Sequence, residues 1–428
     1  MKKRIIALVL VAGMVLSLGA CSTSKISATN LMDNPKIKKE QGKDVTTSKE
    51  QKDELNIAAT DFSVRLLQNT LASKKEEGKT NTLLSPMSVL IALSMTANGA
   101  KEDTLKQMEN VLGAPITKLN GYLGNYQSTT AKDADTKLHI ANSIWFTDDN
   151  RFTVNDEFLQ ANANSYNADV FKATFDENTL NDINTWVEEN TEGMIKNILN
   201  EIPEDAIMYL INAVAFDAKW QVPYEIYQVN EGEFTKQDGT KISVDMMHSS
   251  EAYYLEDEQA VGFIKHYEGQ KYAFVALLPN EGVTVDEYVS SLTGEHLQTM
   301  LRSPQEVTVF AEIPKFETEY SVLMQDVLKE MGMVDAFDKE KADFSGLGSY
   351  STGNIWINRV IHKTYMAVDE LGTKAGASTV VEVMAEGAFF VEDAKEVYLN
   401  RPFVYMIIDC ESNVPVFLGT YEGNETAK

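Results

Sequence analysis

Residues 362–383 read HKTYMAVDELGTKAGASTVVEV, and from Thr373 onward this stretch has the alternation of a strand. Successive side chains of a strand point to opposite faces, which separates the residues into two sets. The uncharged set, small and then β-branched, is Thr373, Ala375, Ala377, Thr379, Val381 and Val383. The set with both charges is Lys374, Gly376, Ser378, Val380 and Glu382. The pattern predicts a segment suited to a sheet with one buried face. The alternative is a flexible Gly/Ala/Ser linker over residues 372–379.

Strand patterns occupy much of the second half of the chain. Residues 272–278 and 403–408 are continuous apolar runs, which is typical of strands buried on both faces. Residues 307–313 alternate between apolar and polar side chains, which indicates a strand with one wet face.

Helix patterns come earlier. One begins near Leu55, and another begins at Ser85-Pro86, where serine is a good N-cap and proline suits the first helical position. The second helix is expected to end near Asn98-Gly99. Early helices and late strands predict an α+β protein, and no break in composition divides residues 55–428 into two domains.

The first twenty residues have the features of an export signal. Three cations at positions 2–4 precede an apolar run, residues 5–18, that is short for a membrane span. The run ends in Leu18-Gly-Ala-Cys21, which is similar to the bacterial lipobox, where the cysteine thiol takes the lipid. We expect residues 1–20 to be a lipoprotein signal peptide and Cys21 the lipid attachment site. The alternative is an ordinary secretory signal with a chance cysteine.

Residues 21–54 are expected to be a flexible tether. Residues 22–54 hold seven Lys and six Asp or Glu with few large apolar side chains, too few to bury a core. The protein would then lie outside the cytoplasm, anchored to the bacterial membrane or cell surface through its lipid alone. Cys410 would have no partner for an intrachain disulfide.

Charge and motifs exclude several classes of function. A net charge of −26 argues against nucleic-acid and anionic-membrane partners, because both would repel the chain. The five histidines have no zinc-type spacing, and the chain lacks a nucleophile elbow, a P-loop and a dinucleotide-binding glycine motif. We therefore expect no enzyme activity, no metal and no cofactor.

Five segments resemble the serpin family, in the order and approximate spacing of that family. They are Asn81-Thr-Leu-Leu-Ser-Pro-Met-Ser-Val89, Leu210-Ile-Asn-Ala-Val-Ala-Phe-Asp-Ala-Lys-Trp220, Ile313-Pro-Lys-Phe316, His362-Lys-Thr-Tyr-Met-Ala-Val-Asp-Glu-Leu-Gly-Thr373 and Arg401-Pro-Phe-Val-Tyr-Met-Ile-Ile408. The resemblance covers essentially all of residues 55–428, expected to be a single serpin domain. It implies an α+β fold with a large mixed central sheet, two smaller sheets, about nine helices and an exposed reactive loop near the C-terminus.

The resemblance also implies a mechanism. A target protease, serine or cysteine, cuts the loop and is held as a covalent acyl-enzyme while the loop inserts into the large sheet as a new strand. A monomeric inhibitor is the expectation.

Site residues follow from the resemblance, position by position. The loop hinge comprises Glu370, Gly372, Thr373, Ala375 and Ala377. The shutter, a hydrogen-bonded cluster beneath the point where the sheet parts, comprises Ser85, Ser88, Asn212 and His362. The breach, where the loop first enters, comprises Trp220, Lys315 and Glu370. An ion pair is expected between Lys315 and Glu370; the alternative is two unrelated surface charges. Lys374 departs from the family, in which inhibitory members usually carry Glu there.

The family's usual spacing from Glu370 places the cut bond at Glu386-Gly387. One residue shorter gives Ala385-Glu386, and Met384 and Ala385 would suit an elastase-like pocket. We expect an elastase-like or glutamyl protease as the target.

Two further classes of function remain open. One is a non-inhibitory serpin-fold surface lipoprotein that binds a partner. The other is a solute-binding lipoprotein, which fits the signal and the acidity but not the five ordered segments. An SDS-stable complex with a protease would distinguish the inhibitor from both.

Overall fold

The computed structural model describes eight stretches of the chain. They are residues 26–38, 48–74, 81–130, 137–166, 168–203, 206–351, 353–373 and 393–423. Cys21, the signal peptide and most of the proposed loop, including Ala375, Ala377 and Met384 to Gly387, lie outside the described residues.

Helices dominate the first part of the described chain and strands the second, as expected: six of the nine described α-helices end by Asn190, and 13 of the 18 strands lie from Met208 onward. The α-helices are α1 Lys49–Lys74, α2 Pro86–Ala97, α3 Glu102–Leu112, α4 Ile116–Thr130, α5 Asp156–Ser165, α6 Glu177–Asn190, α7 Val285–Ser291, α8 Gly294–Arg302 and α9 Gln325–Glu330. The strands are β1 Thr29–Asn30, β2 Thr82–Leu84, β3 Lys137–Thr147, β4 Phe152–Val154, β5 Asp169–Ala173, β6 Met208–Lys219, β7 Val229–Thr235, β8 Lys241–Glu256, β9 Ala260–His266, β10 Tyr272–Pro279, β11 Gln305–Pro314, β12 Phe316–Leu323, β13 Gly348–Tyr350, β14 Arg359–Val368, β15 Gly372–Thr373, β16 Lys395–Tyr398, β17 Phe403–Asp409 and β18 Val414–Tyr421. No described helix is long and apolar enough to cross a membrane.

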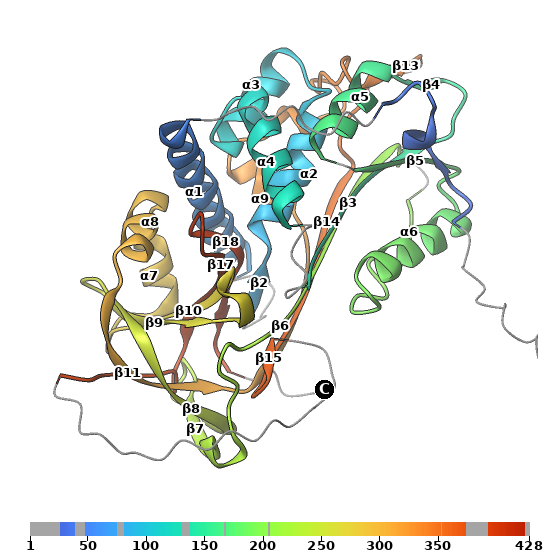
Figure 1. Ribbon diagram of the computed structural model, residues 1–428. Coiled ribbons are helices and arrows are strands. Elements are labelled where there is room, and N and C mark those ends of the chain that lie inside the picture. Colours follow the sequence, from blue (N-terminus) through green and yellow to red (C-terminus); the bar gives the residue numbers. More distant parts are fainter. Residues whose placement is uncertain are drawn as a thin grey trace, which may run out of the picture.

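The central sheet has seven strands in the order β1-β5-β3-β6-β15-β14-β12. Its pairs β3–β5 and β6–β14 are parallel and the others are antiparallel, so the sheet is mixed as expected. Two-residue β15 lies between β6 and β14 at one end of the sheet, which is the lower end in Figure 1.

The second sheet differs from the expectation of two smaller sheets. It has nine strands, ordered β16-β11-β8-β9-β10-β17-β18-β2, with β7 added on β8. Strand β8 has sixteen residues. The first part pairs with β7 and β11, and the last part pairs with β9, so β8 joins β7, β11 and β16 to β9, β10, β17, β18 and β2 in one sheet. A separate two-stranded sheet pairs β4 with β13.

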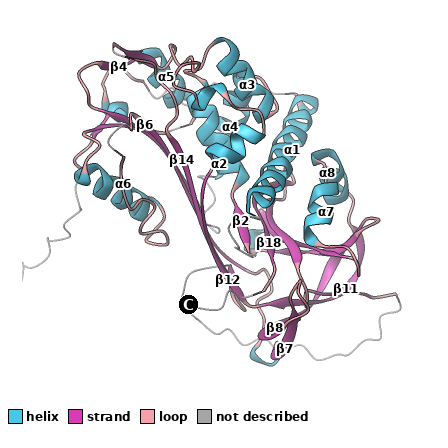
Figure 2. Ribbon diagram, turned by 180° about the vertical axis from the view of Figure 1, so that it is seen from behind, coloured by secondary structure: helices cyan, strands magenta, loops and turns pink. Residues whose placement is uncertain are grey.

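Both faces of the central sheet are covered, and β6 shows how the sequence achieves this. Leu210, Val214 and Phe216 belong to the main core, whereas Tyr209 and Ile211 belong to a second core with α6. The period of two explains why β6 is an almost continuous apolar run. In Figures 1 and 2, α6 lies on one side of the sheet, and α1, α2 and α4 lie on the other.

Residues 26–38 and 49–54 are not a flexible tether. Strand β1 pairs with the edge strand β5, and Met32 is buried in the main core. The Asp182 carboxylate of α6 accepts hydrogen bonds from the amides of Ser27 and Ala28, at 3.0 and 2.8 Å. Helix α1 begins at Lys49, six residues before the expected start. Residues 26–38 are held by the edge strand β5 and by the buried carboxylate of Asp182. The composition of the segment does not reveal these partners.

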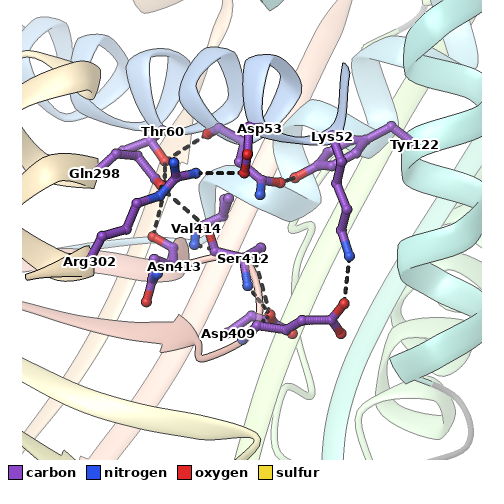
Figure 3. A network of polar contacts seen from close by, with 12 residues as sticks. Lys52, Asp53, Thr60, Tyr122, Gln298, Arg302, Asp409, Ser412, Asn413 and Val414 are labelled. Atoms are coloured by element: carbon purple, nitrogen blue, oxygen red, sulfur yellow. Dashed lines mark hydrogen bonds and ion pairs between the residues drawn. The ribbon is translucent and has the colours of Figure 1, made fainter. Parts of the chain in front are cut away.

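A polar network fixes the last strand pair against two helices (Figure 3). The Gln298 side chain of α8 is buried and donates to Thr60 Oγ1 of α1 at 2.7 Å and to the Asn413 carbonyl at 2.8 Å. Asn413 lies in the turn between β17 and β18 with a φ of 55°, a region that asparagine tolerates better than most residues. Arg302 extends the network from Gln298 Oε1 to Asp53.

Candidate functional site

The candidate site begins where β6 and β14 separate. Their parallel register runs from the pair Arg359–Tyr209 to the pair Tyr365–Ala215, and beyond it β15 lies between them. Gly372 pairs with Lys219 of β6, and Thr373 pairs with Ala218 of β6 and with Val368 of β14. Thr373, the first residue of the predicted loop strand, is therefore already part of the sheet, together with Gly372 of the predicted hinge.

A tight turn over residues 369–372 directs the chain into this position. The Asp369 carboxylate accepts hydrogen bonds from the amides of Leu371 and Gly372, at 2.8 and 3.1 Å. A Cβ on Gly372 would lie 2.0 Å from the Ala218 carbonyl oxygen, so only glycine fits beside β6. The sequence analysis identified Gly372 but not Asp369. Aspartate three residues before glycine is a turn signal that could have indicated it.

Thr373 is fully buried, and its hydroxyl has a partner. Thr373 Oγ1 lies 2.6 Å from the Tyr267 hydroxyl, whose ring stacks on Trp220 at 4.5 Å between centroids. Trp220 in turn donates its indole N–H to the Asp369 carbonyl at 2.8 Å and its amide to the Leu371 carbonyl at 2.9 Å. The tryptophan, which the sequence assigned to the breach, thus supports both sides of the turn.

Lys315 and Glu370 form an ion pair beside this turn. Lys315 Nζ lies 2.6 Å from Glu370 Oε2, and both side chains are partly exposed. Burial acts to raise the pKa of the Glu370 carboxyl, but the contact with Lys315 and a hydrogen bond from the residue's own backbone together outweigh burial and lower that pKa below its usual value. An exposed pair of this kind contributes little to the stability of the fold.

The four predicted shutter residues meet beneath the point where the strands separate. Ser88 of α2, Asn212 of β6 and His362 of β14 are buried side chains linked by hydrogen bonds from Asn212 to Ser88 and from His362 to Asn212. Asn142 of β3 completes the cluster, because its Oδ1 accepts from Ser88 at 3.2 Å and also from Asn212. Asn142 was not predicted from the sequence; it lies in β3 next to another polar residue, Ser143.

Ser85 does not cap α2 with its side chain, contrary to the expectation. Its hydroxyl donates to the Val416 carbonyl at 2.8 Å, and its amide donates to His362 Nε2 at 3.0 Å. Nε2 is therefore the acceptor nitrogen, and Nδ1 carries the hydrogen that bonds Asn212 Oδ1. Complete burial lowers the pKa of the His362 imidazole to about 3, so the ring is neutral at physiological pH.

The comparisons with known proteins agree with this architecture. A family model described as Serpin (serine protease inhibitor) matches residues 57–423. The chain belongs to the serpin family. Ipis-1 of Ixodes persulcatus is 30% identical to this serpin, covering 84% of this chain and 96% of the relative. Human neuroserpin is 29% identical over 86% of this chain and 92% of its own.

Two solved structures show which conformation this serpin has. A crystal structure of the thermophilic serpin tengpin in the native state has 44% identity and a TM-score of 0.86, covering 93% of this chain and 100% of that chain. Tengpin in the latent state has 45% identity and a TM-score of 0.76, covering 87% and 98%. This serpin is more similar to the native form, which fits the direct pairing of β6 with β14 in the described sheet. The α+β serpin fold is confirmed, and members of the family are mostly protease inhibitors rather than catalysts.

Proposed function

We propose that this serpin is a suicide inhibitor of serine-type proteases. The serine oxygen of the target attacks the carbonyl carbon of a bond within residues 374–392, the peptide C–N bond breaks, and the leaving amine takes the proton. Before water can cleave the resulting ester, the freed loop enters the space between β6 and β14, and the protease remains covalently attached.

The start of β15 carries this proposal. Thr373 is buried between β6 and β14 in the uncut chain, and it is the first residue of the uncharged alternating set. Since a strand continues with period two, the next inward residues are Ala375 and Ala377, which are small enough to enter with little steric resistance. A linker that never inserts would not need a buried, hydrogen-bonded first residue.

The sequence supports two target classes. Glutamate at position 386 suits a glutamyl endopeptidase, whereas Met384 and Ala385 suit an elastase-like protease. Residues 384–387 lie outside the described residues. The experiment below distinguishes the two classes of protease.

The test is covalent complex formation. The purified chain is mixed with an elastase and with a bacterial glutamyl endopeptidase, and an SDS-stable band of the summed mass is expected with at least one of them. Each protease with its active serine chemically blocked is the control and forms no such band. Cleavage without a band would favour the non-inhibitory alternative and contradict the proposal.

We also propose a lipid anchor at Cys21, which places the inhibitor on the outer side of a bacterial membrane. The lipobox-like Leu18-Gly-Ala-Cys21 supports this location. Mass spectrometry of protein extracted from membranes is expected to find a diacylglyceryl group on Cys21, and an unmodified N-terminus elsewhere would contradict it.

A further inference from the structure

Three large apolar side chains are exposed on the segment that follows β6. Val222 is 70% exposed, Ile226 is 91% exposed and Tyr227 is 70% exposed. Across the described residues, the other exposed large apolar side chains are Phe310, Leu323 and Val334. Single exposed apolar side chains are ordinary, whereas three within six residues indicate an interaction surface.

The segment of residues 221–228, here called the docking segment, is held firmly despite its exposed side chains. Tyr224 is buried, with its ring centroid 4.5 Å from Lys265 Nζ and its hydroxyl 3.3 Å from Ser249 Oγ. Gln228 Oε1 accepts from the Glu225 amide at 2.8 Å. A surface fixed in this way loses little conformational entropy when a partner binds.

Both ends of the loop sequence are attached to elements that border the docking segment. On one side, the Tyr224 amide donates to the Glu370 carbonyl at 2.8 Å, beside β15. On the other side, the described residues after the loop sequence begin at Asp393, and strand β16 pairs with β11. Strand β11 pairs with β8, and β8 pairs with β7. In Figure 1, β6, β7, β8 and β15 gather at the lower end of the molecule. A protease that binds any bond between residues 374 and 392 is thus tethered at the pole that carries the docking segment.

The charged residues around the docking segment indicate which charge the partner carries. Glu225 lies between the exposed apolar residues, and the exposed Glu231 follows on β7. The whole chain has a net charge of −26, so a second copy would be repelled at this surface and a basic partner would be attracted.

We infer that Val222, Ile226 and Tyr227 form an accessory docking surface for the target protease, on a part of the protease that combines apolar and basic side chains. This inference rests on the proposed function. The surface acts before cleavage: it accelerates association and selects among proteases that cut the same bond, and it takes no part in loop insertion. Because the loop already holds the protease nearby, a small apolar contact is sufficient.

The test compares a triple variant, V222S/I226S/Y227S, with a matched control, V334S, which removes an exposed apolar side chain of an unrelated region. The probe is whichever protease, the elastase or the glutamyl endopeptidase, forms the SDS-stable complex. The triple variant is expected to reduce the second-order rate constant of association at least about tenfold, since it removes all three apolar side chains of the surface at once. Stoichiometry of inhibition and melting temperature stay unchanged in both variants.

Three outcomes would overturn the inference. The first is an association rate constant that is unchanged in the triple variant, and the second is an equal reduction of that rate constant in V334S. The third is that the unmodified chain sediments as a dimer and the triple variant as a monomer. If the unmodified chain forms no SDS-stable complex with either protease, the proposed function itself is wrong. The gel of the unmodified chain shows this without any variant. A complex with normal stoichiometry but unchanged rates in the variant overturns the docking surface and leaves the inhibitor intact.

Discussion

His362 links the conformation of a single side chain to the opening of the central sheet. Its ring is neutral, accepts a hydrogen bond from the Ser85 amide and donates one to Asn212. His362 belongs to β14 and Asn212 to β6, so this bond directly joins the two strands that would separate in the proposed mechanism. The proposed loop insertion would break or rearrange it.

We expect His362 to make the stability of the native form depend on pH. Its pKa is about 3 in the folded chain and about 6.5 when unfolded, so below pH 6.5 the unfolded chain binds a proton that the native ring does not. Stability is therefore lost as pH falls from about 6.5 towards 3, by up to about 1.4 kcal/mol per unit.

The measurement is the urea unfolding midpoint between pH 4 and pH 7, for the natural chain and for H362Q. Carboxylates titrate in both proteins, so the difference between the two curves isolates the histidine. The natural chain should lose more stability on acidification than the variant. Parallel curves would show that the buried ring does not control this effect.

Thr373 makes a second prediction at the scale of the residue. Thr373→Arg should turn the inhibitor into a substrate, because a buried, unpaired charge costs about 3–5 kcal/mol and blocks the start of the inserting strand. Cleavage needs no insertion, so hydrolysis of the loop continues. Thr373→Ser, which keeps the hydroxyl near Tyr267, is the control and should retain the covalent complex. An undiminished complex in the arginine variant would contradict the role of β15.

At the scale of the element, the sequence predicted interior strands better than the ends of the fold. The apolar runs at 272–278 and 403–408 are indeed buried strands, β10 and β17, because burial on both faces needs apolar side chains throughout. Residues 26–38 were missed because their fixed position depends on partners far along the chain. The Ser85 hydroxyl was expected to cap α2 for the same reason, because the local sequence cannot show that this hydroxyl donates to the distant Val416 carbonyl instead.

Asp182 allows a test of the N-terminal strand. Asp182→Ala removes the acceptor of the Ser27 and Ala28 amides, and hydrogen exchange over residues 26–38 should accelerate by about tenfold or more, since a net bond to a charged group is worth ~1.5–3 kcal/mol. Glu188→Ala changes an exposed carboxylate on the same helix and should leave exchange unchanged. Equal protection in both variants would mean that the pairing of β1 with β5 and the burial of Met32 hold the segment without Asp182.

At the scale of the whole molecule, the site depends on a sheet that is not yet complete. Seven residue pairs join β6 directly to β14, and a full inserted strand would replace these pairs with two new ladders. About fifteen added residues at ~3.3 Å each would form a strand of about 50 Å. The new hydrogen bonds are offset by the entropy of ordering the loop, ~1–2 kcal/mol per residue. Under the proposed mechanism, the release of strain in the expanding sheet would therefore decide the outcome, and the uncut form would be held kinetically.

The sequence predicted that a strand begins at Thr373, but it did not predict that this residue is already paired in the sheet of the uncut chain. Alternation from Thr373 onward predicted a strand, because period two needs no tertiary information. That Gly372 and Thr373 are already paired follows from the Asp369 turn and the close approach of Ala218, which only the folded chain shows.

The most direct measurement is a thermal melt of the chain before and after one cut between Thr379 and Val391, with the cut confirmed by mass spectrometry. Nicking usually destabilises a protein, but here the freed loop should insert between β6 and β14, and the cut form should melt at a higher temperature than the intact one. A cut form that melts at the same temperature or lower would show that the loop does not insert, and the proposed inhibitory mechanism would be wrong.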